Sequence, residues 1–264
     1  MEKIDILSLS PETLGQYLAE MGEPKFRAKQ LFSWLHQKQV TDFAQMTTLS
    51  LQLRQKLNEK FCINRLNIAR KLASSADDTV KYLYELPDGN FVETVLMDYH
   101  HGKSLCISTQ VGCRMGCQFC ASTIAGYVRD LQPSELLLQI YETQRDAGCR
   151  IDSIVLMGIG EPLDNFDNVV QFFRLLSHPD GMNMSLRHAA LSTCGLVPQI
   201  RQLADLRLGV TLSVSLHSPE NQRRSEIMPV NRRYPVEELL DACRYYFDTT
   251  GRRISYEYMM ARDH

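Results

Sequence analysis

The second half of the chain alternates between short apolar runs and longer amphipathic runs, and this alternation constrains the fold more than any other feature. The amphipathic runs have helical spacing, and we expect helices at residues 133–147, 166–176, 197–206 and 236–248. The shorter runs lie between these helices, and we expect strands at residues 152–157, 188–193, 210–216 and 253–260. Strands alternating with helices predict an α/β fold of parallel units, whose ligand sites lie at the carboxyl ends of the strands.

The part of the chain before residue 104 follows a different plan. Residues 8–60 show helical spacing, and Ser10-Pro11 predicts the start of the first helix. Two alternating runs, residues 79–86 and 91–98, flank a Pro87-Asp88-Gly89-Asn90 segment with the chemistry of a hairpin turn. We therefore expect a small helical domain at residues 1–75, a β-hairpin extension at residues 76–103 and an α/β core at residues 104–264.

A further apolar run, residues 104–110, leads into three closely spaced cysteines. Cys113, Cys117 and Cys120 form a C-x3-C-x2-C triplet, and thiols this close in a loop suit a soft metal centre. Three thiolates cannot complete a four-coordinate zinc site alone, and on a cubane 4Fe–4S cluster they would leave one iron without a protein ligand. The triplet therefore predicts a cluster with one open iron.

Three more polar clusters fall at the expected carboxyl ends of strands. They are Gly-Ile-Gly-Glu-Pro at residues 158–162, Ser-Thr-Cys-Gly at residues 192–195 and Ser-Val-Ser-Leu-His at residues 213–217. Because parallel strands end at one edge of a sheet, we expect these clusters and the cysteine triplet to share one rim. Taken singly, their residues have ordinary structural roles, such as capping a loop or bonding to local backbone.

The bulk composition limits the setting of the protein. With 264 residues, 44% of them hydrophobic and 23% charged, the chain has the composition of a globular protein. A net charge of -2 gives no global basic signal, although residues 1–71 carry eleven Lys or Arg against seven Asp or Glu. This local excess suits either a solvated helix surface or an RNA-facing patch. Scattered cysteines, no recognisable signal peptide and no long apolar run predict a cytoplasmic protein without membrane contact.

Several motifs, taken together with their spacing, resemble one known family. They are the cysteine triplet, Met157-Gly-Ile-Gly-Glu-Pro-Leu163, Leu191-Ser-Thr-Cys-Gly195, Ser215-Leu-His-Ser-Pro219 and Pro229-Val-Asn231. These motifs are similar to those of the RlmN/Cfr family, radical S-adenosylmethionine (SAM) methyltransferases that modify an adenine of 23S rRNA. The resemblance runs from the helical domain to the last residue. It implies a 4Fe–4S cluster and SAM as cofactors, and a partial (β/α)6 barrel as the core.

The resemblance also implies roles for individual residues. The three cysteines of the triplet would hold three irons, and the fourth iron would bind SAM. The positions that contact SAM in relatives match Gly160, Glu161, Ser192, Ser215, Leu216 and His217. Cys106 and Glu93 lie at the spacings of a thiol that releases the product through a disulfide and of a base that removes the proton from carbon 2 of adenine. The residues alone predict only a small buried side chain at Cys106 and an exposed charge at Glu93.

One feature of the family's pattern is missing from this sequence. Relatives use a second catalytic cysteine, methylated by SAM, in a C-terminal segment, whereas this sequence ends at Arg262-Asp263-His264. It also ends before the strand that would follow Met260, so we expect five parallel strands and an open edge. Cys194 is the nearest other cysteine to the rim and a poor substitute. We expect a chain of this extent to bind the cluster and SAM more readily than it completes methyl transfer.

The resemblance implies an RNA methyltransferase that acts on carbon 2 of an adenine in 23S rRNA, and in a tRNA anticodon loop as some relatives do, through a methyl-cysteine intermediate. The implied partners are 23S rRNA, tRNA and an electron donor such as flavodoxin or ferredoxin, and we expect a monomer. Three alternatives stay open. They are a relative that methylates carbon 8 of adenine, a radical SAM enzyme that takes hydrogen directly from its substrate, and a noncatalytic fragment that binds RNA and a metal such as zinc.

Overall fold

The structure, a computed structural model, describes residues 3–260. Its centre is an eight-stranded sheet with the strand order β12-β11-β10-β9-β6-β5-β4-β3. Five neighbouring strands run parallel: β6 (Gly102–Cys106), β9 (Ser153–Leu156), β10 (Ala189–Thr193), β11 (Thr211–Ser215) and β12 (Ile254–Glu257). Three antiparallel strands extend the sheet beyond β6: β5 (Phe91–Tyr99), β4 (Val80–Glu85) and β3 (Asn67–Ala73).

The five parallel strands confirm the expected β/α units, and β12 forms one edge of the sheet. The strand expected at residues 104–110 is divided, because β6 ends at Cys106 and the chain bends before β7 (Gln110–Gly112). β7 pairs with β8 (Tyr127–Asp130) in a separate two-stranded sheet. The expected lack of a sixth strand concerns the chain after Met260 and its Arg262-Asp263-His264 end, which lie outside the described residues.

Helices connect the parallel strands close to where the sequence signals predict them. They are α4 (Pro133–Ala147), α5 (Phe166–Ser177), α6 (Val197–Asp205) and α8 (Val236–Thr250). α4 begins with a capping box between Gln132 and Glu135, and it ends at Gly148, which adopts a left-handed conformation. The short polar helix α7 (Asn221–Ile227) was not expected, because it has too few residues to show helical spacing. Within residues 3–260, no helix combines the length and the apolar character needed to cross a membrane.

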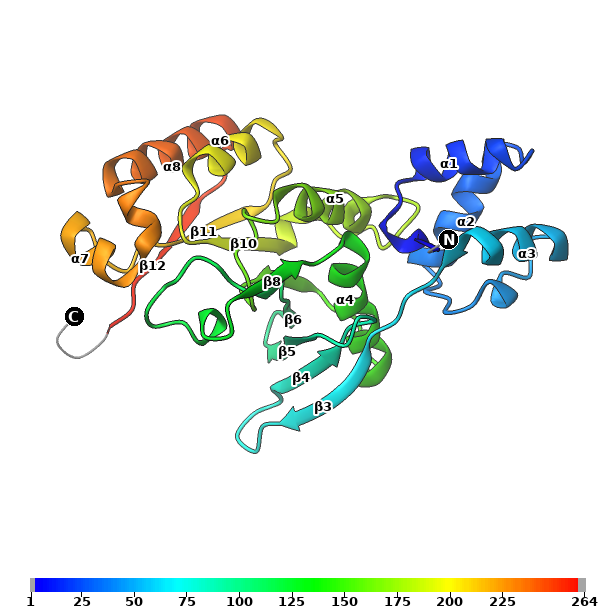
Figure 1. The fold of residues 1–264 in the computed structure, drawn as a ribbon, viewed down its shortest axis with the longest axis horizontal. Helices are drawn as coiled ribbons and strands as arrows, with labels where there is room; N and C mark the ends of the chain where they lie inside the picture. Colours follow the sequence, from blue (N-terminus) through cyan, green and yellow to red (C-terminus); the bar gives the residue numbers. More distant parts are fainter. Residues whose placement is uncertain (1–2, 261–264) are drawn as a thin grey trace.

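Three helices form the N-terminal part of the molecule, at the end opposite α7 and α8 (Figure 1). They are α1 (Pro11–Glu20), α2 (Phe26–His36) and α3 (Leu51–Lys60). α1 begins as predicted, since Ser10 Oγ accepts a hydrogen bond from the backbone N–H of Thr13 at 3.2 Å. A short parallel pair, β1 (Ile4–Asp5) and β2 (Phe61–Cys62), closes this part. Short 3-10 helices lie at Ile6–Ser8, Phe43–Gln45, Ala121–Thr123, Leu186–His188 and Pro229–Arg232.

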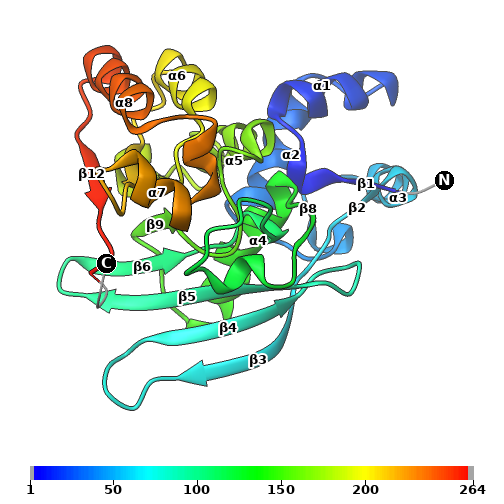
Figure 2. The same ribbon diagram turned by 60° about the vertical axis from the view of Figure 1, so that its left-hand side comes forward.

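Strand β3 lies within residues 1–75, the segment expected to form the helical domain, and it was not predicted as a strand. It forms the outer edge of the main sheet, next to β4 (Figure 2). All of its residues are exposed, so the sequence shows no alternation from which a strand can be predicted. The β4–β5 hairpin was predicted, and the N–H of Leu86 donates to the carbonyl of Asn90 across its turn at 2.8 Å. The hairpin belongs to the main sheet, and the division into three domains stays a prediction.

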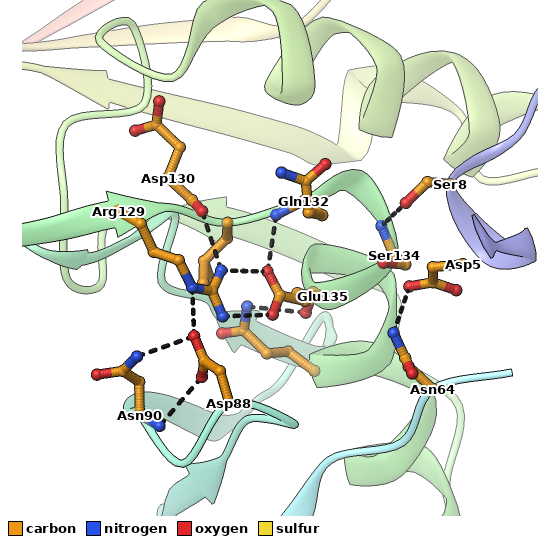
Figure 3. A network of polar contacts seen from close by, with 12 residues as sticks. Asp5, Ser8, Asn64, Asp88, Asn90, Arg129, Asp130, Gln132, Ser134 and Glu135 are labelled. Atoms are coloured by element: carbon orange, nitrogen blue, oxygen red, sulfur yellow. Dashed lines mark hydrogen bonds and ion pairs between the residues drawn. The ribbon is translucent and has the colours of Figure 1, made fainter. Parts of the chain in front are cut away.

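Arg129 on β8 joins the hairpin turn to the first turn of α4 (Figure 3). Its two Nη atoms each donate to the Glu135 carboxylate at 2.8 Å, and its Nε donates to Asp88 at 2.6 Å. Nearby, the backbone N–H of Ser134 donates to Ser8 Oγ at 3.1 Å, which links α4 to the N-terminal segment. Because bidentate charge-assisted bonds fix both partners, this network holds β8 in place beside the sheet.

One hydrophobic cluster extends through the N-terminal helices and the α/β core. His36 of α2 is completely buried in it, and its Nδ1 lies 2.9 Å from the hydroxyl of Tyr141 on α4. The N-terminal helices therefore pack against the core through a continuous apolar interior rather than through a flexible linker.

Candidate functional site

A cavity of about 230 Å³, here called the rim cavity, lies at the carboxyl ends of the parallel strands. Its wall includes the three cysteines of the triplet and most of the residues implied to bind SAM. These are Gly160, Glu161, Ser192, Ser215 and His217. Leu216 does not line the cavity. The polar clusters after successive strands thus meet at one rim, as the parallel topology predicts.

The cysteine loop, residues 113–126, connects β7 to β8. Its two ends approach closely at Gly112, which has a φ of +73°. A Cβ at this position would lie 1.8 Å from the carbonyl oxygen of Gly126, so only glycine fits. The N–H of Cys113 donates to the same oxygen at 3.0 Å. The small β7–β8 sheet therefore clamps the base of the loop.

The three thiols of the triplet differ in exposure. Cys113 and Cys117 are buried, and Cys120 is half-buried. Burial raises the pKa of Cys113 and, together with the neighbouring thiols, raises the pKa of Cys117 to about 12. Both thiols are therefore protonated at neutral pH until a metal binds and displaces the protons. In the described part of the chain, no group of three or more His, Cys, Asp or Glu side chains is arranged to hold a metal ion, so cluster binding at the triplet stays a prediction.

Gly160 and Glu161 form a tight turn after β9. Gly160 has a φ of +107°, and a Cβ there would lie 2.7 Å from the backbone nitrogen of Gln110. Glu161 is 4% exposed, and its carboxylate accepts the backbone N–H of Leu163 at 3.1 Å and that of Cys194 at 2.8 Å. Burial raises the pKa of Glu161. This carboxylate therefore holds the loops after β9 and β10 together at the cavity wall.

Glu257, at the end of β12, also lines the rim cavity. Its Oε2 accepts a hydrogen bond from Ser215 Oγ at 3.2 Å. Its backbone carbonyl accepts the N–H groups of Leu216 at 3.2 Å and His217 at 3.1 Å. Glu257 was not predicted as a site residue, because the strand expected at residues 253–260 extends three residues beyond the observed end of β12.

His217 links the loop after β11 to two other segments. Its backbone has a φ of +55°, and its Nδ1 accepts the N–H of Met259 at 3.1 Å. Its ring packs edge-on against Phe119 of the cysteine loop, with ring centroids 4.8 Å apart. Cys194, expected near the rim, and Met228, which was not predicted there, also line the cavity and pack with Cys117 in a small apolar cluster.

A second cavity of about 740 Å³ adjoins the rim cavity, and Met157 lines both. Cys106 lines this second cavity, and burial raises the pKa of its thiol. Glu93 lines neither cavity. Because side chains alternate along a strand, Glu93 shares a sheet face with Val95, which lines the second cavity and pairs with Cys106. The structure thus places Cys106 and Glu93 on one face of neighbouring strands, outside the rim cavity.

Comparison with known proteins agrees with this geometry. The family model for the ribosomal RNA large subunit methyltransferase N-terminal domain matches residues 4–63, and that for the radical SAM superfamily matches residues 107–263. A probable dual-specificity RNA methyltransferase RlmN of Lachnoclostridium phytofermentans is 52% identical over 98% of this chain and 73% of that protein. The chain belongs to the RlmN family of radical SAM methyltransferases. A protein of the same name in Clostridioides difficile is 46% identical over 99% of this chain and 76% of its own length.

A crystal structure supports the RlmN-family fold. The radical SAM methyltransferase from Sphaerobacter thermophilus matches this structure with a TM-score of 0.90 and 39% identity, over 97% of this chain and 76% of that one. The match confirms the expected family and the partial radical SAM barrel. This sequence spans about three quarters of the length of these relatives.

The radical SAM family uses SAM and a 4Fe–4S cluster, and the residues around the rim cavity fit both groups. The triplet offers three thiols at one cavity, and a cubane binds each thiolate at a different iron. The carboxylates of Glu161 and Glu257 suit the ammonium and hydroxyl groups of SAM. The donor set of this RlmN-family chain is thus chemically suited to both cofactors.

Proposed function

We propose that this protein is a radical SAM RNA methyltransferase that methylates carbon 2 of an adenine in 23S rRNA and in tRNA. The observation that supports this most strongly is the convergence of the cysteine triplet, the Gly160–Glu161 turn and Ser215 on one cavity. The name of the relatives, dual-specificity RNA methyltransferase, supports RNA as the substrate. We further propose that the protein acts as a cytoplasmic monomer with a one-electron donor such as flavodoxin or ferredoxin.

In this proposal the chain's own residues bind and orient both cofactors. The thiolates of the triplet would hold a 4Fe–4S cluster and would leave one iron without a protein ligand, open to the polar groups of SAM. The bound cofactors supply the one-electron chemistry that activates the methyl acceptor. Glu161 would accept from the N–H groups of the SAM amine, and the hydroxyls of Ser192 and Ser215 would bond to other polar groups of SAM. Leu216 and His217 contribute through backbone that is attached to β12.

The proposed catalytic pair lies next to the cofactor site. Glu93 removes the proton from carbon 2 of the adenine. The thiolate of Cys106 then attacks the sulfur of the methyl-cysteine that links protein and base, so that an S–S bond forms as the C–S bond to the product breaks and the released carbon takes up a proton. Two features support these roles: Cys106 lines the cavity that adjoins the rim cavity, and Glu93 lies on the same sheet face. The half-exposed pair of Glu93 with Lys81, at 2.7 Å, keeps the carboxylate accessible to a substrate that enters from solvent.

The helical domain is proposed to hold the RNA. Sequence-specific RNA recognition targets unpaired bases, and chemistry on a base requires that it leaves its stack. Residues 1–71 have eleven basic against seven acidic residues, and the N-terminal family model matches residues 4–63. A basic surface on this part would attract the phosphate backbone and leave the adenine free to enter the core.

The first test is the product made in cells. The full gene that contains this sequence, including any codons after His264, would be expressed in a bacterial host deleted for its own adenine-C2 methylation, and 23S rRNA and tRNA would be digested for mass spectrometry. We expect 2-methyladenosine. The appearance of 8-methyladenosine instead would support the carbon-8 alternative, and unmodified RNA would overturn the proposal.

The second test is the metal content of the purified protein. Anaerobic reconstitution should give a brown protein with about four irons per chain, and SAM should perturb the electron paramagnetic resonance signal of the reduced cluster. A colourless protein that retains zinc and does not bind SAM would instead support the noncatalytic alternative. Methyl-deuterated SAM distinguishes direct hydrogen abstraction, because a methyl-cysteine route retains part of the label in the RNA product.

A further inference from the structure

Arg224 on α7 is completely buried, yet it has no acidic partner. Its exposed fraction is 0%, and within residues 3–260 it forms no ion pair with a carboxylate. Its guanidinium donates only to neutral oxygens. These are Leu216 O at 3.0 Å, Asn231 Oδ1 at 3.0 Å, Cys194 O at 2.6 Å and Ser215 O at 3.1 Å. A buried cation without a counter-charge is costly, so its position calls for an explanation.

The helix that carries Arg224 is attached directly to the cysteine loop. The N–H of Gln118, which lies between two cysteines of the triplet, donates to the carbonyl of Ile227 at the end of α7 at 2.9 Å. Cys194, whose carbonyl Arg224 binds, packs against Cys117. Arg224 does not line the rim cavity, so it does not contact a ligand there. Its charge therefore lies beside the wall of the cavity, close to the thiols.

Two carboxylates bond to residues that Arg224 also binds, but not to Arg224. Glu161 accepts the N–H of Cys194, and Glu257 accepts from Ser215 Oγ. Burial lowers the pKa of Arg224 itself, but a guanidinium stays protonated at neutral pH. The charge of Arg224 is thus present in the folded protein whether or not a cluster is bound.

We propose that Arg224 is a positioning residue that provides the counter-charge for the cluster in its reduced state and so raises the cluster's reduction potential. This inference rests on the proposed function. An external one-electron donor adds one electron to the cluster, which gains one negative charge without any proton transfer. A fixed cation nearby in a region of low dielectric constant stabilises the reduced form more than the oxidised form. The same guanidinium ties the loops after β10 and β11 to α7.

A purely structural role for Arg224 makes a different prediction. If the guanidinium only holds the loops together, Arg224→Lys and Arg224→Gln should disturb the cavity wall to a similar extent, because each loses the planar arrangement of donors. If the charge matters, Arg224→Lys should keep the potential near that of the unmodified protein, and Arg224→Gln should lower it. The readout is a potentiometric titration of the reconstituted cluster, followed by electron paramagnetic resonance with dithionite as the reductant.

For Arg224→Gln we expect the ratio of reduced to oxidised cluster at a fixed potential to fall about tenfold, which corresponds to about 59 mV for a one-electron couple. Equal potentials for the Lys and Gln variants would overturn the inference. If neither the Arg224→Gln nor the Arg224→Lys protein holds a cluster, a second pair of variants tests the effect of the charge on the potential.

That second pair changes Asn231, whose Oδ1 accepts from Arg224. Asn231→Asp keeps the acceptor and adds a negative charge beside the guanidinium, whereas Asn231→Leu adds none. Both lose the amide donor bonds to Asn221 and Ser225. Asn231→Asp should lower the potential relative to Asn231→Leu, and equal potentials would refute the charge role. A protein that binds no iron in its unmodified form would contradict the proposed function instead.

Discussion

The carboxylate of Glu161 accepts the backbone N–H of Cys194 across 2.8 Å, and this bond joins two consecutive βα loops. A second N–H, from Leu163, is bound by the other carboxylate oxygen at 3.1 Å. Because Glu161 is almost completely buried, its bonds to the protein organise the cavity wall before any ligand binds. The same carboxylate thus shapes the site and offers its remaining lone pairs to a cationic ligand.

Glu161→Gln should weaken both the hydrogen bonds that hold the cavity wall and the binding of SAM. The amide of glutamine would place a donor against one of the two N–H groups, leaving a buried donor unsatisfied at a cost of about 1–3 kcal/mol. We expect a lower free energy of unfolding and an affinity for SAM that is reduced at least about tenfold, because the charge is lost as well. Urea denaturation and isothermal titration calorimetry measure the two effects.

Glu135→Gln is the matched control for this substitution. Glu135 is also a buried carboxylate, but its bonds go to Arg129 and to the start of α4, away from the rim cavity (Figure 3). Glu135→Gln should lower the free energy of unfolding to a similar extent as Glu161→Gln and leave the affinity for SAM unchanged. Equal losses of SAM affinity in both variants would show that Glu161 acts only through stability.

Glu257→Gln should weaken the binding of the ribose of SAM. A carboxylate that faces a nucleoside commonly accepts from ribose hydroxyls, and Glu257 already accepts from Ser215 at the cavity wall. Loss of a charge-assisted bond of about 1.4 kcal/mol corresponds to a tenfold weaker affinity for S-adenosylhomocysteine. A 2'-deoxy analogue of this ligand should be much less sensitive to the substitution. The prediction fails if both ligands lose affinity equally.

Glu93→Gln should lower the rate of RNA methylation by about 10²–10⁴-fold, the usual contribution of a general base, with SAM affinity unchanged. Lys81→Met is the control, since it removes the ion-pair partner of Glu93 and keeps the carboxylate. This half-exposed pair is worth less than about 1 kcal/mol, so Lys81→Met should have little effect on stability. Single-turnover assays of 2-methyladenosine formation separate the variants, and an active Glu93→Gln protein would exclude the proposed base.

The free energy of unfolding should decrease as the pH is lowered below about 6.5, because of His36. Burial, aided by the charge of His178, lowers the pKa of His36 to about 3, whereas the unfolded chain has a histidine pKa near 6.5. Between these values the unfolded state binds a proton that the folded state does not, so stability is present above pH 6.5 and is lost as the pH falls. The loss is about 1.4 kcal/mol per pH unit.

His36→Asn provides the comparison, because its amide can still bond to the hydroxyl of Tyr141 but does not titrate. Urea denaturation at several pH values between 5 and 7 should show a smaller pH dependence for the variant. An unchanged slope would mean that His36 is protonated in the folded protein or that other groups control the acid response.

Much of the fold could be predicted because its signals are local. Helix α4 has a proline at its start, apolar residues at helical spacing and glycine after its end, and the structure has the predicted bounds. Strand β3 could not be predicted, since it is an exposed edge strand without alternation and pairs only with β4. The short helix α7 lacks periodicity for a similar reason.

The site could be predicted in part. The rule that ligands bind at the carboxyl ends of parallel strands correctly brought Gly160, Ser192 and Ser215 to the cysteine triplet. The burial of Arg224 and the place of Glu257 in the cavity wall were not predicted, because no local pattern distinguishes a buried arginine or a wall carboxylate from a surface charge. Their positions depend on how α7 and β12 pack against the other loops.

The amino-acid sequence was enough to predict the parallel β/α units, the position of the thiol triplet and the family that the motifs resemble. These features depend on spacing along the chain and on residue chemistry, both of which can be read locally. The folded structure was needed to show that Cys106 and Glu93 lie outside the rim cavity, that Glu161 bonds to Cys194, and that Arg224 is buried without a bonded carboxylate. Such relations arise when residues far apart in the chain are packed together, and burial then sets their charges and hydrogen bonds.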